Sequence, residues 1–215
     1  MQKNFSITRI DWIDFAKGVA IILMVLGHTS PRGDLQNFIY VFHMPFFFVM
    51  AGFLLNLNKW GDAENFKPFV TKLFKRLLVP YFIAEILWYP VWFVFCYEST
   101  FWVPLFPWIQ INPFDAFLAI FKGSGIEWIL LPLWFLPCLL LAEMIFVKLY
   151  NLFNEGDREI FVLAVAIISC IGFNLSYLGI VPFRFNVAFV AQFFFVGGRL
   201  DSEIQFCRTN NFKGL

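Results

Sequence analysis

The chain has 215 residues, of which 60% are hydrophobic and 14% are charged, with a mean hydropathy of +0.72. Soluble globular domains carry about 25% charged residues, so this composition argues against a soluble domain and in favour of a membrane protein. The formal net charge of +1 gives no indication of nucleic-acid binding. The 32 Phe and 8 Trp residues suit lipid-facing and interfacial surfaces.

The four cysteines, Cys96, Cys138, Cys170 and Cys207, are scattered, and three of them lie in apolar runs. They lack the spacing of metal ligands, so we predict small buried hydrophobic residues and no metal site. The first apolar run begins with acidic and basic residues and has no small-residue cleavage site. This pattern indicates a retained membrane helix rather than a cleaved signal peptide.

Six apolar runs have the length and composition of membrane helices. They cover about residues 12–29, 38–57, 79–97, 130–150, 160–178 and 185–197. Between them we expect a polar loop over 58–71 and an irregular region over 98–128, which contains an apolar piece, 113–121, that is too short to span. A polar tail is expected after Arg199. The sequence thus predicts an all-α fold, a polytopic membrane bundle of about six transmembrane helices in a single domain, 1–215.

Basic residues favour one side of this predicted bundle. With the N-terminus inside, twelve Lys and Arg residues fall on that side and three fall on the other. The twelve are Lys3, Arg9, Lys59, Lys67, Lys72, Lys75, Arg76, Lys148, Arg158, Arg199, Arg208 and Lys213, and the three are Arg32, Lys122 and Arg184. Because positive residues accumulate in cytoplasmic loops, both termini are predicted to be cytoplasmic.

The first predicted helix carries the strongest candidate site. Asp14, Lys17 and His28 recur at helical spacing and share one face of this helix. Lys17 and His28 are 11 positions apart, which is about 16 Å along a helix axis. The expected topology places Lys17 near the cytoplasmic end, and places His28 and His43 at the adjoining outer ends of the first two helices. Ionisable groups are costly inside a membrane, so this stripe indicates function.

Four segments together form a specific combination. They are Asp14-x-x-Lys17-Gly18 with an apolar run to Gly27-His28, Phe42-His43-Met44-Pro45, the basic segment 72–81, and Leu133-Trp134-Phe135-Leu136-Pro137. The combination resembles the membrane-bound acyltransferase family 3, the sugar O-acetyltransferases, and in particular their fucose 4-O-acetyltransferase-like branch. The ten residues between Lys17 and His28 match the basic-x10-His motif of that family. The resemblance covers most of residues 9–200. Since the family core has about ten helices, the chain is expected to lack its C-terminal helices.

The resemblance implies an integral protein of the bacterial cytoplasmic (inner) membrane. Such a protein transfers an acetyl group from cytoplasmic acetyl-CoA to a hydroxyl of a cell-envelope sugar or polysaccharide. Neutral imidazole is suited to take the hydroxyl proton near pH 7. His28 is therefore the candidate base, and Lys17 and Asp14 complete the candidate catalytic stripe. His43 is the candidate acceptor-binding residue, although it is also compatible with orienting His28 or capping the second helix.

The basic cluster Lys72, Lys75 and Arg76 is the candidate for binding the CoA phosphates. The same cluster fits a positive-inside anchor for the third helix, a role that the topology requires in any case. Asp14 and Lys17 likewise fit a structural ion pair. Glu85 and Glu143 fit either inward-facing paired groups or hydrated groups close to an interface, and the sequence does not separate these alternatives.

Two other classes of function stay open. One is a catalytically inactive, truncated family member that acts as a scaffold. The other is a transporter, because intramembrane ionisable residues also mark ion paths, although the predicted helices show no inverted repeat. The sequence identifies neither the acceptor sugar nor the acetylated position, and it leaves open whether the chain forms a homo-oligomer.

Overall fold

The structure, a computed structural model, describes residues 11–29, 33–95, 97, 112–123, 131–153, 158–178 and 182–211. Every regular element in these ranges is helical, which confirms the predicted all-α class. The elements are α1 (Asp11–Thr29), α2 (Asp34–Leu54), α3 (Leu57–Trp60), η1 (Ala63–Asn65), α4 (Phe66–Leu73), η2 (Phe74–Leu78), α5 (Val79–Phe95), α7 (Pro113–Phe121), η4 (Leu131–Trp134), α8 (Phe135–Phe153), α9 (Arg158–Leu175), η5 (Ser176–Leu178), η6 (Pro182–Arg184) and α10 (Phe185–Asn211). The predicted tail over 1–9 and most of the predicted irregular region over 98–128 lie outside the described residues.

Four helical segments within the described ranges are long and apolar enough to cross a membrane. They are α1, α2, the continuous segment Ala63–Phe95 and α8. A shorter apolar helix, Glu159–Leu175, makes up nearly all of α9. The short apolar piece expected at 113–121 is the helix α7. The protein is therefore an all-α membrane helix bundle, with a helix at each of the six predicted positions.

The loop predicted over 58–71 is wrong, because most of this stretch is helical. Phe66, Phe69, Val70 and Leu73 follow one another at helical spacing, and Phe69 and Leu73 are buried against α8 and its neighbours. This buried stripe stabilises the helix. The polar residues on the opposite face made the segment resemble a loop in the sequence. A π-helical segment, η2, then joins α4 to α5 without a break. The basic cluster consequently lies along a helix and not in a loop.

The last helix is also longer than predicted. We expected it to end at Gly197, whereas α10 continues to Asn211. Gly198 packs against the backbone of Val49 in α2, where any side chain would collide, so this glycine permits close helix contact. Gly52 of α2 meets the backbone of Phe195 in the same way. Gly52 and Gly198 therefore allow α2 and α10 to pack closely, and Gly198 does not terminate α10.

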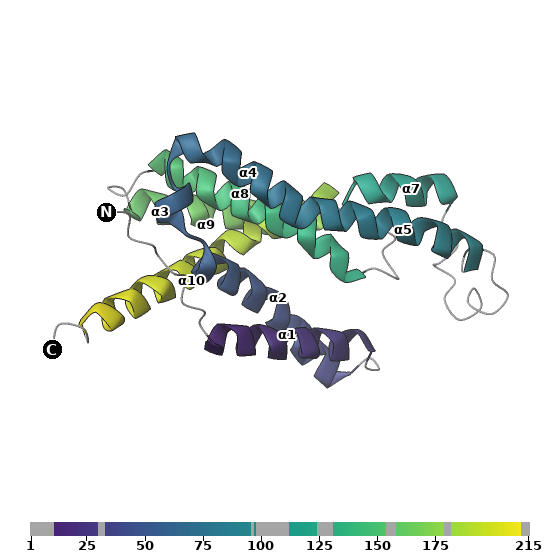
Figure 1. The fold of residues 1–215 in the computed structure, drawn as a ribbon, viewed down its shortest axis with the longest axis horizontal. Helices are drawn as coiled ribbons and strands as arrows, with labels where there is room; N and C mark the ends of the chain where they lie inside the picture. The colour runs from purple at the N-terminus through teal and green to yellow at the C-terminus, as the bar shows by residue number, and fades with distance from the viewer. Residues whose placement is uncertain are drawn as a thin grey trace, which may run out of the picture.

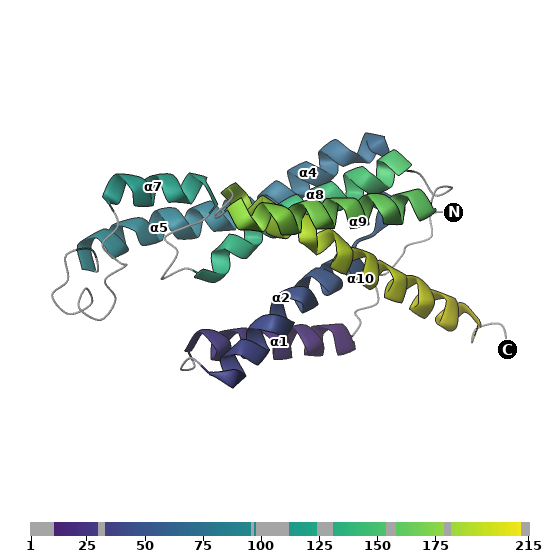
Figure 2. The same ribbon diagram turned by 180° about the vertical axis from the view of Figure 1, so that it is seen from behind.

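The helix α1 lies on one side of the molecule, apart from α4, α5, α8 and α9, and α2 leads from α1 toward these helices, as Figures 1 and 2 show. The helix α10 crosses between these two groups and packs against α2, α8 and α9. The main core joins α2, α4, α8 and α10 and includes Phe48, Phe69, Phe146 and Phe195. This crossing holds the hairpin next to α4 and α8, and the space between them becomes the site described below.

The helix α1 packs mainly against α2. Its buried residues, Ile13, Ala20 and Gly27, recur every seven positions and form a narrow stripe. Much of its remaining surface is apolar and exposed, with Phe15 at 74% and Ile22 at 62%. Exposed Phe and Ile of this kind suit contact with lipid. Consequently α1 has one face on the protein and a broad face suited to the membrane.

Candidate functional site

Three ring side chains come together at the end of the hairpin where α1 ends and α2 begins. The Nδ1 atom of His28 lies 3.2 Å from the Tyr40 hydroxyl. The His28 and His43 ring centroids are 6.5 Å apart, and that of Tyr40 lies 5.4 Å from His28 and 5.5 Å from His43. The sequence predicted that the two histidines would meet, but it did not single out Tyr40. The signal for Tyr40 was its position one turn before His43 on the same helix.

Backbone contacts fix the geometry around these rings. His43 is buried, and its Nδ1 atom lies 2.7 Å from the carbonyl oxygen of Ile39. Because a carbonyl only accepts hydrogen bonds, this nitrogen must carry the proton. Gly27 allows α1 to approach Ile39, since a Cβ at that position would lie 2.9 Å from the Ile39 Cγ2 atom. Gln36 donates a hydrogen bond to the Gly27 carbonyl at 3.0 Å and ties the two helices together beside His28.

The tautomer of His28 determines which of its nitrogens is a base. When Nδ1 carries the proton, it donates to the Tyr40 oxygen and leaves Nε2 as an acceptor. His28 is exposed at the end of α1, so its side chain is accessible from outside the bundle. His43 holds its own proton on Nδ1 toward Ile39 and therefore has its Nε2 as the acceptor. One exposed imidazole, His28, and one buried imidazole, His43, thus lie next to a phenol.

The other end of the hairpin borders a cavity of about 470 Å³ between α1, α2, α3, α4, η2 and α8. This volume lies within the range of about 300–1,000 Å³ that is typical of small-molecule sites. Its lining comprises Lys17, Ile21, Phe47, Met50, Ala51, Leu54, Leu55, Asn56, Lys59, Trp60, Phe69, Lys72, Leu73, Arg76, Leu77, Phe135, Leu139 and Glu143. Four of these residues are cationic and one is acidic, so the lining favours an anionic ligand.

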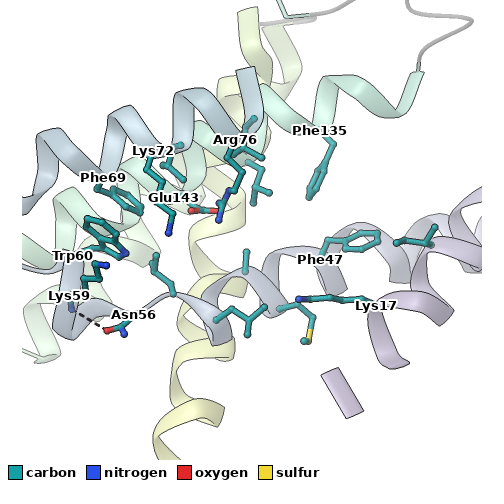
Figure 3. A pocket seen from close by; sticks show the side chains of 18 residues that line it. Lys17, Phe47, Asn56, Lys59, Trp60, Phe69, Lys72, Arg76, Phe135 and Glu143 are labelled. Carbon is teal, nitrogen blue, oxygen red and sulfur yellow. Dashed lines mark hydrogen bonds and ion pairs between the residues drawn. The ribbon is translucent and has the colours of Figure 1, made fainter. Parts of the chain in front are cut away.

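One ion pair stands at the middle of this cavity, as Figure 3 shows. Arg76 donates from its Nη2 atom to the Oε1 atom of Glu143 at 2.5 Å. The side chain of Glu143 is 7% exposed, whereas that of Arg76 is 48% exposed. The buried carboxylate therefore holds one side of a guanidinium whose other side is open. Glu143 is thus an inward-facing paired group, one of the two alternatives left open by the sequence, and Glu85 is fully buried in α5.

The two ends of the cavity differ in chemistry. Trp60 lies at one end, where the Nζ atoms of Lys59 and Lys72 approach its ring centroid to 4.7 Å and 5.3 Å. In Figure 3, Lys17, Phe47 and Phe135 lie at the opposite end, with the Arg76–Glu143 pair between the two ends. The Phe47 and Phe135 ring centroids are 5.7 Å apart. One end is aromatic and cationic, and the other is largely apolar apart from Lys17.

The apolar end leads toward the histidines along the hairpin. Phe47 is four residues, one helical turn, beyond His43 on α2. Ile21 is seven residues, about two turns, before His28 on α1. The lining thus ends about one turn from His43 on α2 and about two turns from His28 on α1.

The structure distributes the predicted site residues over several places. Lys17, Lys72 and Arg76 line the cavity together, although they come from α1, α4 and η2. Lys75 does not line it; it borders a surface groove whose lining also includes Lys67, Lys72 and Arg76. Asp14 is exposed and is not part of the cavity lining. The sequence did not single out Lys59 or Trp60, because their loop was not expected to fold against α4.

Comparison with known proteins identifies the family. A protein-family model described as an acyltransferase domain matches residues 10–200. The chain therefore belongs to acyltransferase family 3, which agrees with the resemblance of its motifs. It is also 30% identical over 191 residues to a protein of Enterococcus faecalis named amino-acid racemase. That alignment covers 84% of this chain and 24% of the relative, so the chain spans about a quarter of that protein. No solved structure matches the chain.

Proposed function

We propose that this protein is an O-acetyltransferase that moves an acetyl group from acetyl-CoA to a hydroxyl of a cell-envelope sugar or polysaccharide. The family match over residues 10–200 supports acyl transfer as the class of reaction. The racemase name belongs to a relative about four times longer, so it does not guide the proposal. The bacterial cytoplasmic membrane, with both termini in the cytoplasm, remains the proposed location on the basis of the Lys and Arg distribution.

The observation that carries the proposal is the cavity whose lining combines cationic side chains with hairpin residues one turn from His43 and two turns from His28. CoA is a polyanion with a long flexible arm that ends in the acyl thioester. The cations Lys72 and Arg76 suit the phosphates, and the apolar end of the cavity, where Lys17 lies, suits the arm. The distance of about 16 Å along α1 between Lys17 and His28 is then spanned by the donor itself.

In this proposal His28 is the catalytic base. Its Nε2 atom takes the proton of the acceptor hydroxyl as that oxygen attacks the thioester carbonyl. The new C–O bond forms, the C–S bond breaks, and the CoA thiolate leaves. The proton on the imidazolium passes to this thiolate, which restores neutral His28 and releases CoA with a free thiol. Tyr40 is a positioning residue whose hydroxyl oxygen accepts a hydrogen bond from Nδ1–H of His28, which keeps Nε2 unprotonated as the base. His43 adjoins the acceptor.

The test uses membranes that contain the full chain and acetyl-CoA labelled in the acetyl group. We expect base-labile label in the polysaccharide fraction with the wild-type chain and none above background with His28→Ala. The variant should be present in the membrane in equal amount. Equal labelling by a folded His28→Ala variant would contradict the role of His28. A wild-type chain that binds acetyl-CoA without transferring label would instead favour the scaffold interpretation.

A further inference from the structure

The aromatic and cationic end of the cavity has no role in the chemistry at His28. Trp60 lines the cavity, is half-buried, and carries the ammonium groups of Lys59 and Lys72 near its ring. Phe69 supports it, with a ring centroid 5.5 Å from that of Trp60. An aromatic ring in a cavity with two cations beside it has the features of a site for a base that bears phosphate.

We infer that Trp60 stacks on the adenine base of the acyl donor while Lys59 and Lys72 bind its ribose 3′-phosphate. This inference rests on the proposed function, which makes acetyl-CoA the donor. It adds that the protein recognises the nucleotide at the far end of the donor from the reacting thioester. Trp60 then selects donors that carry a nucleotide over those that carry only the pantetheine arm.

The order of groups along the cavity sets this orientation. The thioester must reach His28, so the arm of the donor has to follow the apolar end at Phe47 and Phe135. Arg76 lies in the middle with one side open, where the diphosphate would pass. The nucleotide is then left at the remaining end, which is the end that holds Trp60. Three chemical groups of the donor thus meet three matching parts of the cavity in the same order.

The two ammonium groups fit this arrangement without a large rearrangement. Lys59 extends from the four-residue helix α3, whose N-cap Asn56 accepts a hydrogen bond from the Lys59 backbone N–H at 3.1 Å. Lys72 approaches the same ring from α4. An anion beside the ring would attract both flexible side chains, because an ammonium–phosphate contact is stronger than a cation–ring contact. The ring face that they now partly occupy would then be available to the base.

The experiment measures binding to the purified full chain in detergent, with acetyl-CoA, 3′,5′-ADP and S-acetyl-4′-phosphopantetheine as probes. We expect Trp60→Leu to weaken acetyl-CoA and 3′,5′-ADP binding about 5- to 150-fold, which is the range of base–aromatic stacking. Trp60→Phe should stay within about 3-fold of wild type, because it keeps a stacking ring. Binding of the phosphopantetheine probe should not change in either variant.

The matched control is Phe66→Leu. The Phe66 ring also carries an ammonium group, the Nζ atom of Lys148 at 5.5 Å, but it does not line the cavity. This variant should bind all three probes as wild type does. If a folded Trp60→Leu variant also binds acetyl-CoA as wild type does, the inference is wrong and the proposed donor stands.

The remaining outcomes separate the inference from the proposed function. Binding of 3′,5′-ADP that depends on Trp60, without acetyl transfer, would support the inference and contradict the proposed function. A wild-type chain that binds neither acetyl-CoA nor 3′,5′-ADP would overturn both. If Trp60→Leu does not fold, competition binding to the wild-type chain tests the inference instead. Failure of 3′,5′-ADP to compete with bound acetyl-CoA would overturn it.

Discussion

The two ends of the α1–α2 hairpin are built in different ways. At the end that carries the histidines, His28 and Tyr40 are 12 residues apart and belong to consecutive helices. At the end that borders the cavity, Arg76 and Glu143 are 67 residues apart, and the cavity takes its lining from six separate elements. A short helical hairpin is therefore enough to bring the imidazole and phenol rings together, whereas the cavity depends on packing across the bundle. The following substitutions test this division.

The largest expected effect separates chemistry from donor binding. His28→Ala should lower kcat about 10²- to 10⁴-fold, the usual contribution of a general base, with little change in the KM for acetyl-CoA. Lys17→Gln, at the other end of the same helix, should mainly raise that KM. Steady-state kinetics at saturating acceptor would measure both, and His43→Ala should lower kcat less than His28→Ala does. A change in KM alone for His28→Ala would contradict the separation of chemistry at His28 from donor binding at the cavity.

Substitutions in the ion pair should have unequal effects on stability. Arg76→Gln leaves the buried Glu143 carboxylate without its charged partner, and we expect a loss of about 2–3 kcal/mol in the free energy of unfolding. This is less than the ~3–5 kcal/mol of a fully buried pair, because Arg76 is half exposed. Glu143→Gln keeps an oxygen for Arg76 and should cost about 1 kcal/mol. Thermal unfolding in detergent would rank the two variants, and equal losses would contradict the asymmetry.

Neighbouring lysines of equal charge provide a sharper test of the cavity. Lys72 lines the cavity and Lys75 does not. Lys72→Gln should raise the KM for acetyl-CoA about 2- to 10-fold, since a charged hydrogen bond at a partly exposed site contributes roughly 0.5–1.5 kcal/mol. Lys75→Gln removes the same charge and should change KM less than about 2-fold. Equal increases would mean that the donor responds to net charge rather than to the cavity.

The smallest expected effect concerns the orientation of His28. Tyr40→Phe removes the hydroxyl that lies 3.2 Å from the His28 Nδ1 atom. We expect kcat to fall about 2- to 10-fold, which corresponds to one ordinary hydrogen bond. The control is Tyr89→Phe, which removes a hydroxyl that donates to the Pro113 carbonyl at 3.0 Å, far along the chain from the hairpin. Tyr89→Phe should leave kcat unchanged, and a similar fall in both variants would contradict a positioning role for Tyr40.

The contrast between the two ends of the hairpin also explains which site residues could be predicted from the sequence. Periodicity along one helix placed Lys17 and His28 on a common face, and the short connection to the next helix placed His43 nearby. The same reasoning treated Lys72, Lys75 and Arg76 as one cluster because they are close in the chain. All three residues do line one surface groove, but only Lys72 and Arg76 also line the cavity. A π-helical segment, which changes the angle between successive side chains, begins between Lys72 and Lys75.

The sequence by itself determined the membrane class, the helical fold, the family motifs and the pairing of two imidazoles. These features follow from local rules: apolar run length, helical period and short connections. Only the tertiary structure decided that Lys17, Lys59, Trp60 and Glu143 line one cavity. Their proximity depends on α10 crossing α2 at Gly52 and Gly198 and on the amphipathic helix α4 packing against α8. Contacts between segments so distant in the chain arise from helix packing, which no local pattern of residues specifies.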